Sequence, residues 1–123
     1  MAEARERVVY RIFYRTVKTD PPSRESLTSN KALGRPPRGA EIRDPSLWDG
    51  LSVMDTLELA LERAREYPMH GAYVAELTFS DDILIVAKKT GGRGHYTLYG
   101  AADTLRACIT RVYPVDRPEE GQP

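Results

Sequence analysis

The sequence predicts an α+β domain with a compact, mostly antiparallel β core, one main helix over 55–67, a short C-terminal helix and a long N-terminal loop. The order of elements is a strand, a long loop, one helix and a strand-rich second half, which is typical of α+β folds. A length of 123 residues is close to the commonest domain size. We therefore expect a single domain over 1–123, with its core at about 7–115, a loop at 19–50 and a frayed tail at 116–123.

The first strand is predicted over Arg7 to Lys18, where both alternating sets of side chains are rich in β-branched and aromatic residues. Such a strand is apolar on much of both faces and suits the centre of a sheet. Pro21 and Pro22 end it, because neither ring can donate to a strand ladder.

The segment over 19–50 has no hydrophobic periodicity and is rich in Pro, Gly and Ser. A loop of this length is uncommon in so small a domain and is usually functional or mobile. We expect Gly34 to Gly39 to be its least ordered part. Trp48 is expected to hold the end of the loop against the core.

The main helix is preceded by a short apolar piece, Leu51 to Met54. Asp55 is the predicted N-cap, and Glu58 completes a capping-box-like pair. The residue before Pro68 disfavours helical angles, so the helix ends there. Its apolar face is expected to contain Leu57, Ala60, Leu61 and Ala64.

The second half is predicted to contain a strand over Ala72–Phe79, a turn at Asp81-Asp82, a strand over Ile83–Ala87, a glycine turn over 90–94, a strand over His95–Tyr99, a helix over Ala101–Cys108 and a strand over Ile109–Val115. Cys108 is expected to be a small buried hydrophobic residue.

Composition excludes several classes of protein. The 18 basic and 18 acidic residues give a formal net charge of 0, which argues against general nucleic-acid binding. One cysteine and two histidines argue against a disulfide and a dedicated metal site. No run approaches the roughly 20 apolar residues of a membrane span. The charged start lacks a secretory signal, so we expect a cytoplasmic protein with no membrane partner.

Arg15, Ser52 and Glu76 are polar residues in segments that are otherwise apolar. Glu76 either faces solvent beside Thr78 or lies in a cleft with Arg15 or Arg11 as its partner, since a buried carboxylate needs one. Ser52 is either a plain strand-end residue or supports a neighbouring glutamate or a ligand hydroxyl.

These residues lie in three short motifs: Phe13-Tyr14-Arg15-Thr16 in the first strand, Gly50-Leu51-Ser52-Val53 before the helix, and Ala75-Glu76-Leu77 in a later strand. In order and spacing they resemble the core motifs of the ADP-ribosyltransferase fold, over roughly Tyr10 to Phe79. The resemblance implies an ADP-ribosyltransferase-like fold, with NAD as substrate and no metal.

The resemblance also implies roles for the three residues. Arg15 would contact the nicotinamide-side ribose or a phosphate of NAD, where an arginine fork suits a pyrophosphate. Ser52 would hold Glu76 or the ribose. Glu76 would bind the ribose 2′-hydroxyl and stabilise the positive sugar that forms as nicotinamide leaves.

Further side chains are candidates for contacts with NAD. Arg11 lies four residues before Arg15 on the same strand face, so the two arginines are candidates to bind one anion. Tyr14, Tyr67 and Tyr73 are candidates to stack on the nicotinamide ring.

The function that follows is an NAD-dependent ADP-ribosyltransferase or NAD-cleaving enzyme, acting as a toxin, a defence effector or a modifier. Its acceptor is a protein, a nucleic acid or a small molecule. The alternative is a non-catalytic module that binds a protein partner or a nucleotide through the loop over 23–48. The loop carries the basic residues Arg24, Lys31, Arg35, Arg38 and Arg43.

His95 follows a glycine-rich turn and forms half of the His-x-Thr pattern of two-histidine phosphoesterases. His70 does not supply the second half, because Gly71 and Ala72 follow it. We therefore interpret His95 as a histidine at the edge of a strand. The glycines over 91–94 are a weak phosphate cradle, because no well-formed helix follows them.

Overall fold

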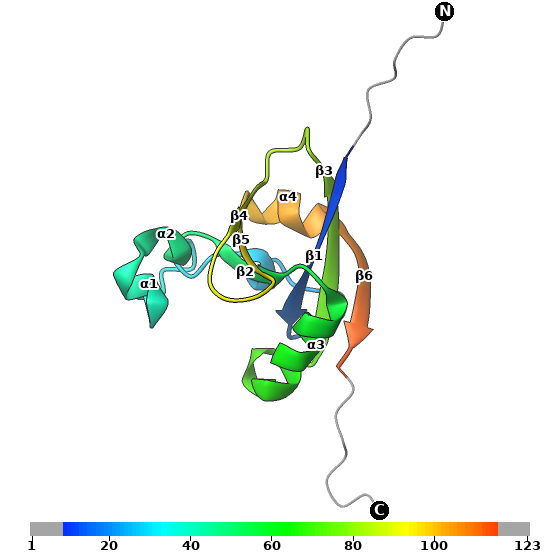
Figure 1. Ribbon diagram of the computed structural model, residues 1–123, viewed down its shortest axis with the longest axis horizontal. Coiled ribbons are helices and arrows are strands. Elements are labelled where there is room, and N and C mark those ends of the chain that lie inside the picture. Colours follow the sequence, from blue (N-terminus) through cyan, green and yellow to red (C-terminus); the bar gives the residue numbers. More distant parts are fainter. Residues whose placement is uncertain (1–8, 116–123) are drawn as a thin grey trace, which may run out of the picture.

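One antiparallel sheet of six strands organises residues 9–115, the part of the chain that the computed structural model describes (Figure 1). The strands lie in the order β4-β5-β2-β1-β3-β6. Their bounds are β1 Tyr10–Val17, β2 Leu51–Met54, β3 Tyr73–Ser80, β4 Val86–Lys89, β5 His95–Tyr99 and β6 Ile109–Pro114. The predicted α+β class, the antiparallel pairing and the interior position of the first strand are confirmed.

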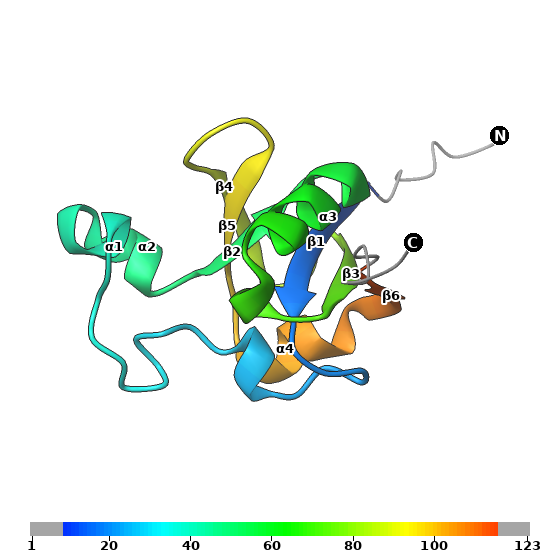
Figure 2. The same cartoon turned by 90° about the horizontal axis from the view of Figure 1, so that it is seen from below.

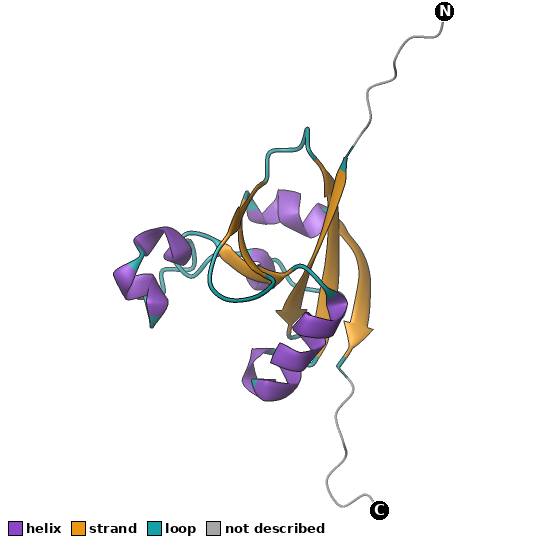
Figure 3. Cartoon of the chain, viewed as in Figure 1, coloured by secondary structure: helices purple, strands orange, loops and turns teal. Residues whose placement is uncertain are grey.

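Short helices surround the sheet (Figure 3). They are η1 Glu25–Leu27, α1 Ala40–Arg43, α2 Pro45–Trp48, α3 Leu57–Glu66, η2 Pro68–His70 and α4 Ala102–Ala107, where η marks a 3-10 turn. Helix α3 covers one face of the sheet, η1 and α4 lie on the other face, and α1 and α2 lie to one side (Figure 2). The predicted main and C-terminal helices are confirmed, each shorter than expected.

Alternation along β1 divides the apolar residues between two clusters. Phe13 and Val17 are buried in the larger cluster, together with Leu105 from α4. Met54 and Val74 lie on the opposite face, where the buried alanines of α3 pack against them. The sheet is therefore apolar on both faces at its centre, as the composition of the first strand predicted.

The long loop contains more structure than expected and is anchored by Leu27. This leucine is 1% exposed and belongs to the larger cluster. Trp48 was predicted to hold the loop against the core, but it belongs to neither hydrophobic cluster, and its indole N–H donates to the Arg35 carbonyl oxygen at 2.8 Å. Trp48 thus closes the loop on itself, while Leu27 ties the loop to the domain.

Two local predictions need correction. Thr56, not Asp55, caps α3, because its side chain accepts a hydrogen bond from the Leu59 N–H. The strand predicted over Ile83–Ala87 begins only at Val86, where pairing with β5 starts. Residues 83–85 connect β3 to β4, and Leu84 there is 89% exposed.

Strands β1 and β2 are in register at a single position, Tyr14 with Met54. By contrast, β1 pairs with β3 along its whole length. Beyond Tyr14 the chain of β1 continues to Val17 without a register partner in β2, so the sheet opens between these neighbouring strands. The predicted residues 116–123 of the tail, and the first two residues of the predicted first strand, lie outside the described part of the chain.

Candidate functional site

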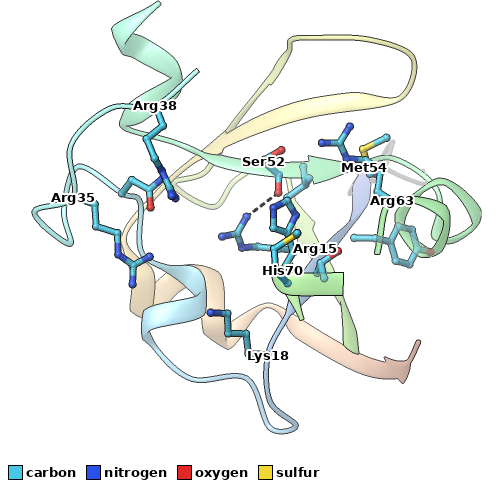
Figure 4. A pocket seen from close by; sticks show the side chains of 13 residues that line it. Arg15, Lys18, Arg35, Arg38, Ser52, Met54, Arg63 and His70 are labelled. Atoms are coloured by element: carbon cyan, nitrogen blue, oxygen red, sulfur yellow. Dashed lines mark hydrogen bonds between the residues drawn. The ribbon is translucent and has the colours of Figure 1, made fainter. Parts of the chain in front are cut away.

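A pocket of about 520 Å³ lies where β1 and β2 separate (Figure 4). Its walls come from both strands, from the loop before β2, from α3 and from η2. The lining residues are Tyr14, Arg15, Thr16, Lys18, Asn30, Arg35, Arg38, Ser52, Val53, Met54, Arg63, Met69 and His70. The structure therefore brings Tyr14, Arg15 and Ser52 together and adds side chains from distant segments.

The pocket is strongly cationic. Its lining includes no aspartate or glutamate within the described residues, although the whole chain has no net charge. An ion pair between Arg35 Nη2 and Glu25 Oε2, at 2.7 Å, offsets part of this charge. The permanently charged lining side chains are Arg15, Lys18, Arg35, Arg38 and Arg63. Several positive charges gathered in one pocket create a positive potential that attracts an anionic ligand.

Arg15 spans the opening between the strands. Its Nε–H donates to the Ser26 carbonyl oxygen at 2.7 Å, and its Nη1–H donates to the Ser52 carbonyl oxygen at 2.9 Å. Desolvation by burial lowers the pKa of the Arg15 guanidinium to about 10, so it stays charged at neutral pH. Arg15 therefore links the loop to β2 and keeps a cation in the pocket.

The lowered pKa of His70, at the end of η2, shows that several cations lie close to its imidazole. Desolvation by burial lowers the pKa of its imidazole, and the charges of nearby cations lower it further. These cations are Arg63, Arg15, Arg38 and Lys18. The ring also stacks on Tyr67 at a centroid separation of 5.5 Å. The predicted stacking residue Tyr67 thus contacts His70 and does not line the pocket.

Ser52 forms a side-chain contact that the sequence did not indicate. Its Oγ is hydrogen-bonded to His95 Nε2, which lies on the neighbouring strand β5. His95 Nδ1 lies 3.1 Å from the Thr90 carbonyl oxygen and 3.0 Å from Thr90 Oγ1. We assign the proton to Nδ1, because the carbonyl can only accept, and Nε2 then accepts from the Ser52 hydroxyl. His95 is the first residue of β5, in agreement with the interpretation as a histidine at the edge of a strand, and it also contacts Ser52.

Glu76, on β3, does not itself line the pocket, but it interacts with Tyr14, which does: after burial, the Glu76 carboxylate is the main cause that raises the pKa of the Tyr14 hydroxyl. Its carboxylate accepts hydrogen bonds from Thr110 Oγ1 at 2.8 Å and from the Tyr113 hydroxyl at 3.1 Å. In the register, Glu76 is opposite Tyr14, and Arg15 is opposite Ala75. Neighbouring residues of a strand point to opposite faces, so Glu76 and Arg15 do not meet. Of the two alternatives for Glu76, the one that pairs it with Arg15 or Arg11 in a cleft is therefore wrong.

Of the remaining residues predicted to contact NAD, one lines the pocket and two lie elsewhere. Tyr14 lines the pocket. Arg11 lies over the rings of Phe13 and Tyr96, at 5.1 and 5.8 Å from their centroids. Tyr73 packs against the larger hydrophobic cluster. Neither Arg11 nor Tyr73 is among the lining residues.

A second hollow of about 260 Å³ adjoins the pocket and shares Arg15, Lys18 and His70 with it. Its walls are rich in hydroxyl groups, which come from Thr16, also in the first pocket, and from Thr19, Ser23, Ser26 and Thr28; they also include Glu25, the ion-pair partner of Arg35. Cationic and hydroxyl-rich surfaces therefore lie side by side, a combination suited to a ligand with both anionic and sugar-like parts.

No group of three or more His, Cys, Asp or Glu side chains in the described residues is placed to hold a metal ion. Over the same residues, no helix has the length and apolar character needed to cross a membrane. Comparison with protein-family models, curated proteins and solved structures found no match to this chain.

Proposed function

We propose that this protein binds a phosphate-bearing nucleotide in the pocket between β1 and β2, with NAD as the first candidate. The observation that carries this proposal is the set of cationic side chains that line the pocket without any carboxylate from the described residues. A volume of about 520 Å³ lies within the usual range for small-molecule sites.

Each part of a dinucleotide has a chemically suitable surface in the proposed mode of binding. The pyrophosphate would lie against Arg15, Arg38 and Lys18, where charge-assisted hydrogen bonds are available. A base or nicotinamide ring would lie against Tyr14 and Met54. Ribose hydroxyls would face the adjoining hydroxyl-rich hollow.

The proposed reaction is the cleavage of the bond between nicotinamide and ribose, as in ADP-ribosyltransferases. The resemblance of the three motifs supports it, and so does the presence of Arg15 and Ser52 in one pocket. Glu76 is held by Thr110 and Tyr113 outside that pocket. We therefore assign ligand binding to Arg15 and leave to experiment the role that the resemblance gives to Glu76.

Calorimetric titration with NAD tests the proposal, and the loop supplies a matched pair of variants. Arg38 lines the pocket, whereas Arg43 is exposed at the end of α1 and does not line it. We expect saturable binding of NAD that Arg38→Ala weakens about tenfold, which corresponds to about 1.4 kcal/mol. Arg43→Ala should leave it unchanged.

Inorganic pyrophosphate and nicotinamide, titrated separately, identify which part of the ligand is bound. The proposal predicts that pyrophosphate competes with NAD. If neither NAD nor pyrophosphate binds saturably at millimolar concentration, the proposal is contradicted. The release of nicotinamide from bound NAD then measures hydrolysis or transfer.

The alternative proposal, a module that binds a partner through the loop over 23–48, has less support. Arg35 and Arg38 line the pocket, and Arg24 forms an ion pair with Asp103 at 2.9 Å. These contacts direct much of the basic character of the loop toward the domain itself. Deletion of 34–39 distinguishes the proposals, since loss of partner capture with full retention of NAD binding would favour the module.

A further inference from the structure

Ser52 and His95 form a hydroxyl–imidazole pair at the pocket that the proposed function does not use. They are 43 residues apart in the chain, and the antiparallel pairing of β2 with β5 brings them together. Met54 is opposite His95 in the register, so Ser52 and His95 lie on the same sheet face, one step apart along the strands. Ser52 is exposed and lines the pocket.

The orientation of His95 is fixed from two sides. Its backbone N–H donates to the Gly92 carbonyl oxygen at 3.2 Å, and its Nδ1–H donates to the Thr90 carbonyl oxygen at 3.1 Å. The ring therefore presents the unprotonated Nε2 to the Ser52 hydroxyl. A nucleophile, a base and a third group that orients the base are the parts of an activated-serine site.

Electrostatics also favour a base at this position. Desolvation by burial lowers the pKa of His95, and the charges of Arg63 and Lys89 lower it further, whereas the hydrogen bond to Thr90 opposes the shift. The imidazole is consequently neutral near pH 7 and able to accept a proton. The hydroxyl of Ser52 is exposed to solvent and would be satisfied by water, so burial does not require the histidine as its partner.

The charged groups around Ser52 and His95 indicate which kind of electrophile could bind there. Arg15 donates to the backbone carbonyl of Ser52 itself, and Arg38 and Arg63 line the same pocket. Guanidinium groups bind phosphoryl oxygens and stabilise the charge that develops on them during substitution at phosphorus. A phosphoryl group is therefore the electrophile that this surface suits best.

We propose that Ser52 is a nucleophile toward phosphate esters held in the pocket and that His95 is its general base. The proposal rests on the proposed function only for the anionic character of the ligand. Ser52 Oγ attacks phosphorus, the Oγ–P bond forms and the bond from phosphorus to the leaving oxygen breaks. The Oγ proton passes to His95 Nε2 and then to the leaving oxygen. Water then attacks phosphorus while the same imidazole takes its proton; the Oγ–P bond breaks, the proton passes from His95 Nε2 to Ser52 Oγ, and the phosphate product leaves.

An alkyl fluorophosphonate tests the first step without knowledge of the natural substrate. Its P–F bond breaks as the Oγ–P bond forms, fluoride leaves, and the adduct remains on the serine for mass spectrometry. We expect labelling of the full chain at Ser52. Ser52→Ala should remove it, and Ser46→Ala, a change at an exposed serine in α2, should not.

The role of His95 is tested by the rate of labelling. General-base catalysis is worth about 100-fold or more, so His95→Ala should lower the rate by about that factor. Added imidazole should restore much of the rate in His95→Ala and none in Ser52→Ala, a rescue that a purely structural histidine would not show. Thermal unfolding of each variant identifies any loss of rate caused by misfolding.

Three outcomes would overturn the proposal: no adduct on Ser52, an adduct whose rate does not depend on His95, or a loss of rate that imidazole does not restore in a folded variant. Its failure is separate from that of the proposed function, because NAD titration of Ser52→Ala measures binding alone. Inorganic pyrophosphate should slow labelling if the pair and the cationic pocket share one ligand.

Discussion

At the scale of the residue, the positions of single charged groups determine what the pocket can bind. Arg15 uses two of its N–H groups to join carbonyl oxygens of the loop and of β2, and remains charged at neutral pH. It thus serves both the structure and the proposed ligand. Arg38 lies in the same pocket without that structural task in the described residues, which makes it the cleaner position for mutation.

His70 predicts a pH dependence of binding. Its imidazole has a lowered pKa because of burial and of the cations Arg63, Arg15, Arg38 and Lys18, so it is neutral in the free protein at pH 7. A bound anion offsets those cations and raises the pKa of His70, so the complex takes up a proton. Affinity for NAD should therefore rise as the pH falls, by about fivefold between about pH 7.5 and about pH 5.5.

Calorimetry at the two pH values measures this effect, and the phosphates of NAD do not titrate between them. His70→Gln removes the titrating group and should make the affinity nearly independent of pH. A dependence that persists in His70→Gln would assign the effect to another group.

Glu76 gives a second prediction for a single residue. The Glu76 carboxylate contacts Thr110, Tyr113 and Tyr14 but does not itself line the pocket. Glu76→Gln keeps a hydrogen-bonding side chain beside Tyr14, so it should leave the Kd for NAD unchanged within about twofold. Weaker hydrogen bonds to Thr110 and Tyr113 should lower the free energy of unfolding by about 1 kcal/mol. Urea unfolding and calorimetry on the same preparation measure both effects. A large loss of affinity in a stable variant would place Glu76 at the ligand.

At the scale of the element, α3 illustrates what a local pattern can and cannot specify. Its apolar spacing was sufficient to predict the helix and its buried alanines, Ala60 and Ala64. The cap was predicted one residue too early, since Asp55 and Thr56 are both good N-cap residues and the local pattern does not decide between them.

The cap assignment is testable. Thr56→Ala should lower the free energy of unfolding by about 1 kcal/mol, because the Leu59 N–H loses its side-chain acceptor. Asp55→Ala should have a smaller effect, since the structure uses the backbone N–H of Asp55, which donates to the Gly94 carbonyl oxygen at 2.9 Å. Denaturant titration of both variants compares them, and a larger loss in Asp55→Ala would restore the original assignment.

The site was only partly predictable, because a local sequence pattern does not show which distant segments pack together. Arg15 and Ser52 were found because polar groups in apolar segments are unusual, and Tyr14 because its ring is a candidate to stack on nicotinamide. Arg63 and His70 were not, because nothing in a local pattern shows that a helix and the turn after it will lie against the opening between β1 and β2. Strand register, which the sequence does not give, also decides that Ser52 meets His95 and not Glu76.

At the scale of the whole molecule, the described part of the chain consists of a sheet that is apolar on both faces at its centre and a long loop that completes the pocket. The loop contributes Asn30, Arg35 and Arg38 to the pocket and is tied to the larger hydrophobic cluster by Leu27. Pocket and core are therefore coupled through one segment. The predicted fold class followed from element order, whereas this coupling depends on long-range packing.

Leu27 tests the coupling. Leu27→Ala should lower the free energy of unfolding by about 2–5 kcal/mol, because it leaves a cavity in the larger hydrophobic cluster. It should also weaken NAD binding, since the loop that carries Arg38 loses its anchor. Leu84→Ala, at a residue that is 89% exposed, should change neither quantity appreciably. Unchanged NAD affinity in a folded Leu27→Ala protein would show that the loop is held by other contacts.

The central claim is that the cationic opening between β1 and β2 binds a phosphate-bearing nucleotide. The most direct test is one calorimetric comparison, NAD titrated into the wild-type protein, Arg38→Ala and Arg43→Ala. The account predicts saturable binding in the wild type, a loss of about tenfold in Arg38→Ala and no change in Arg43→Ala. Absence of binding in the wild type, or equal losses in the two variants, would contradict it.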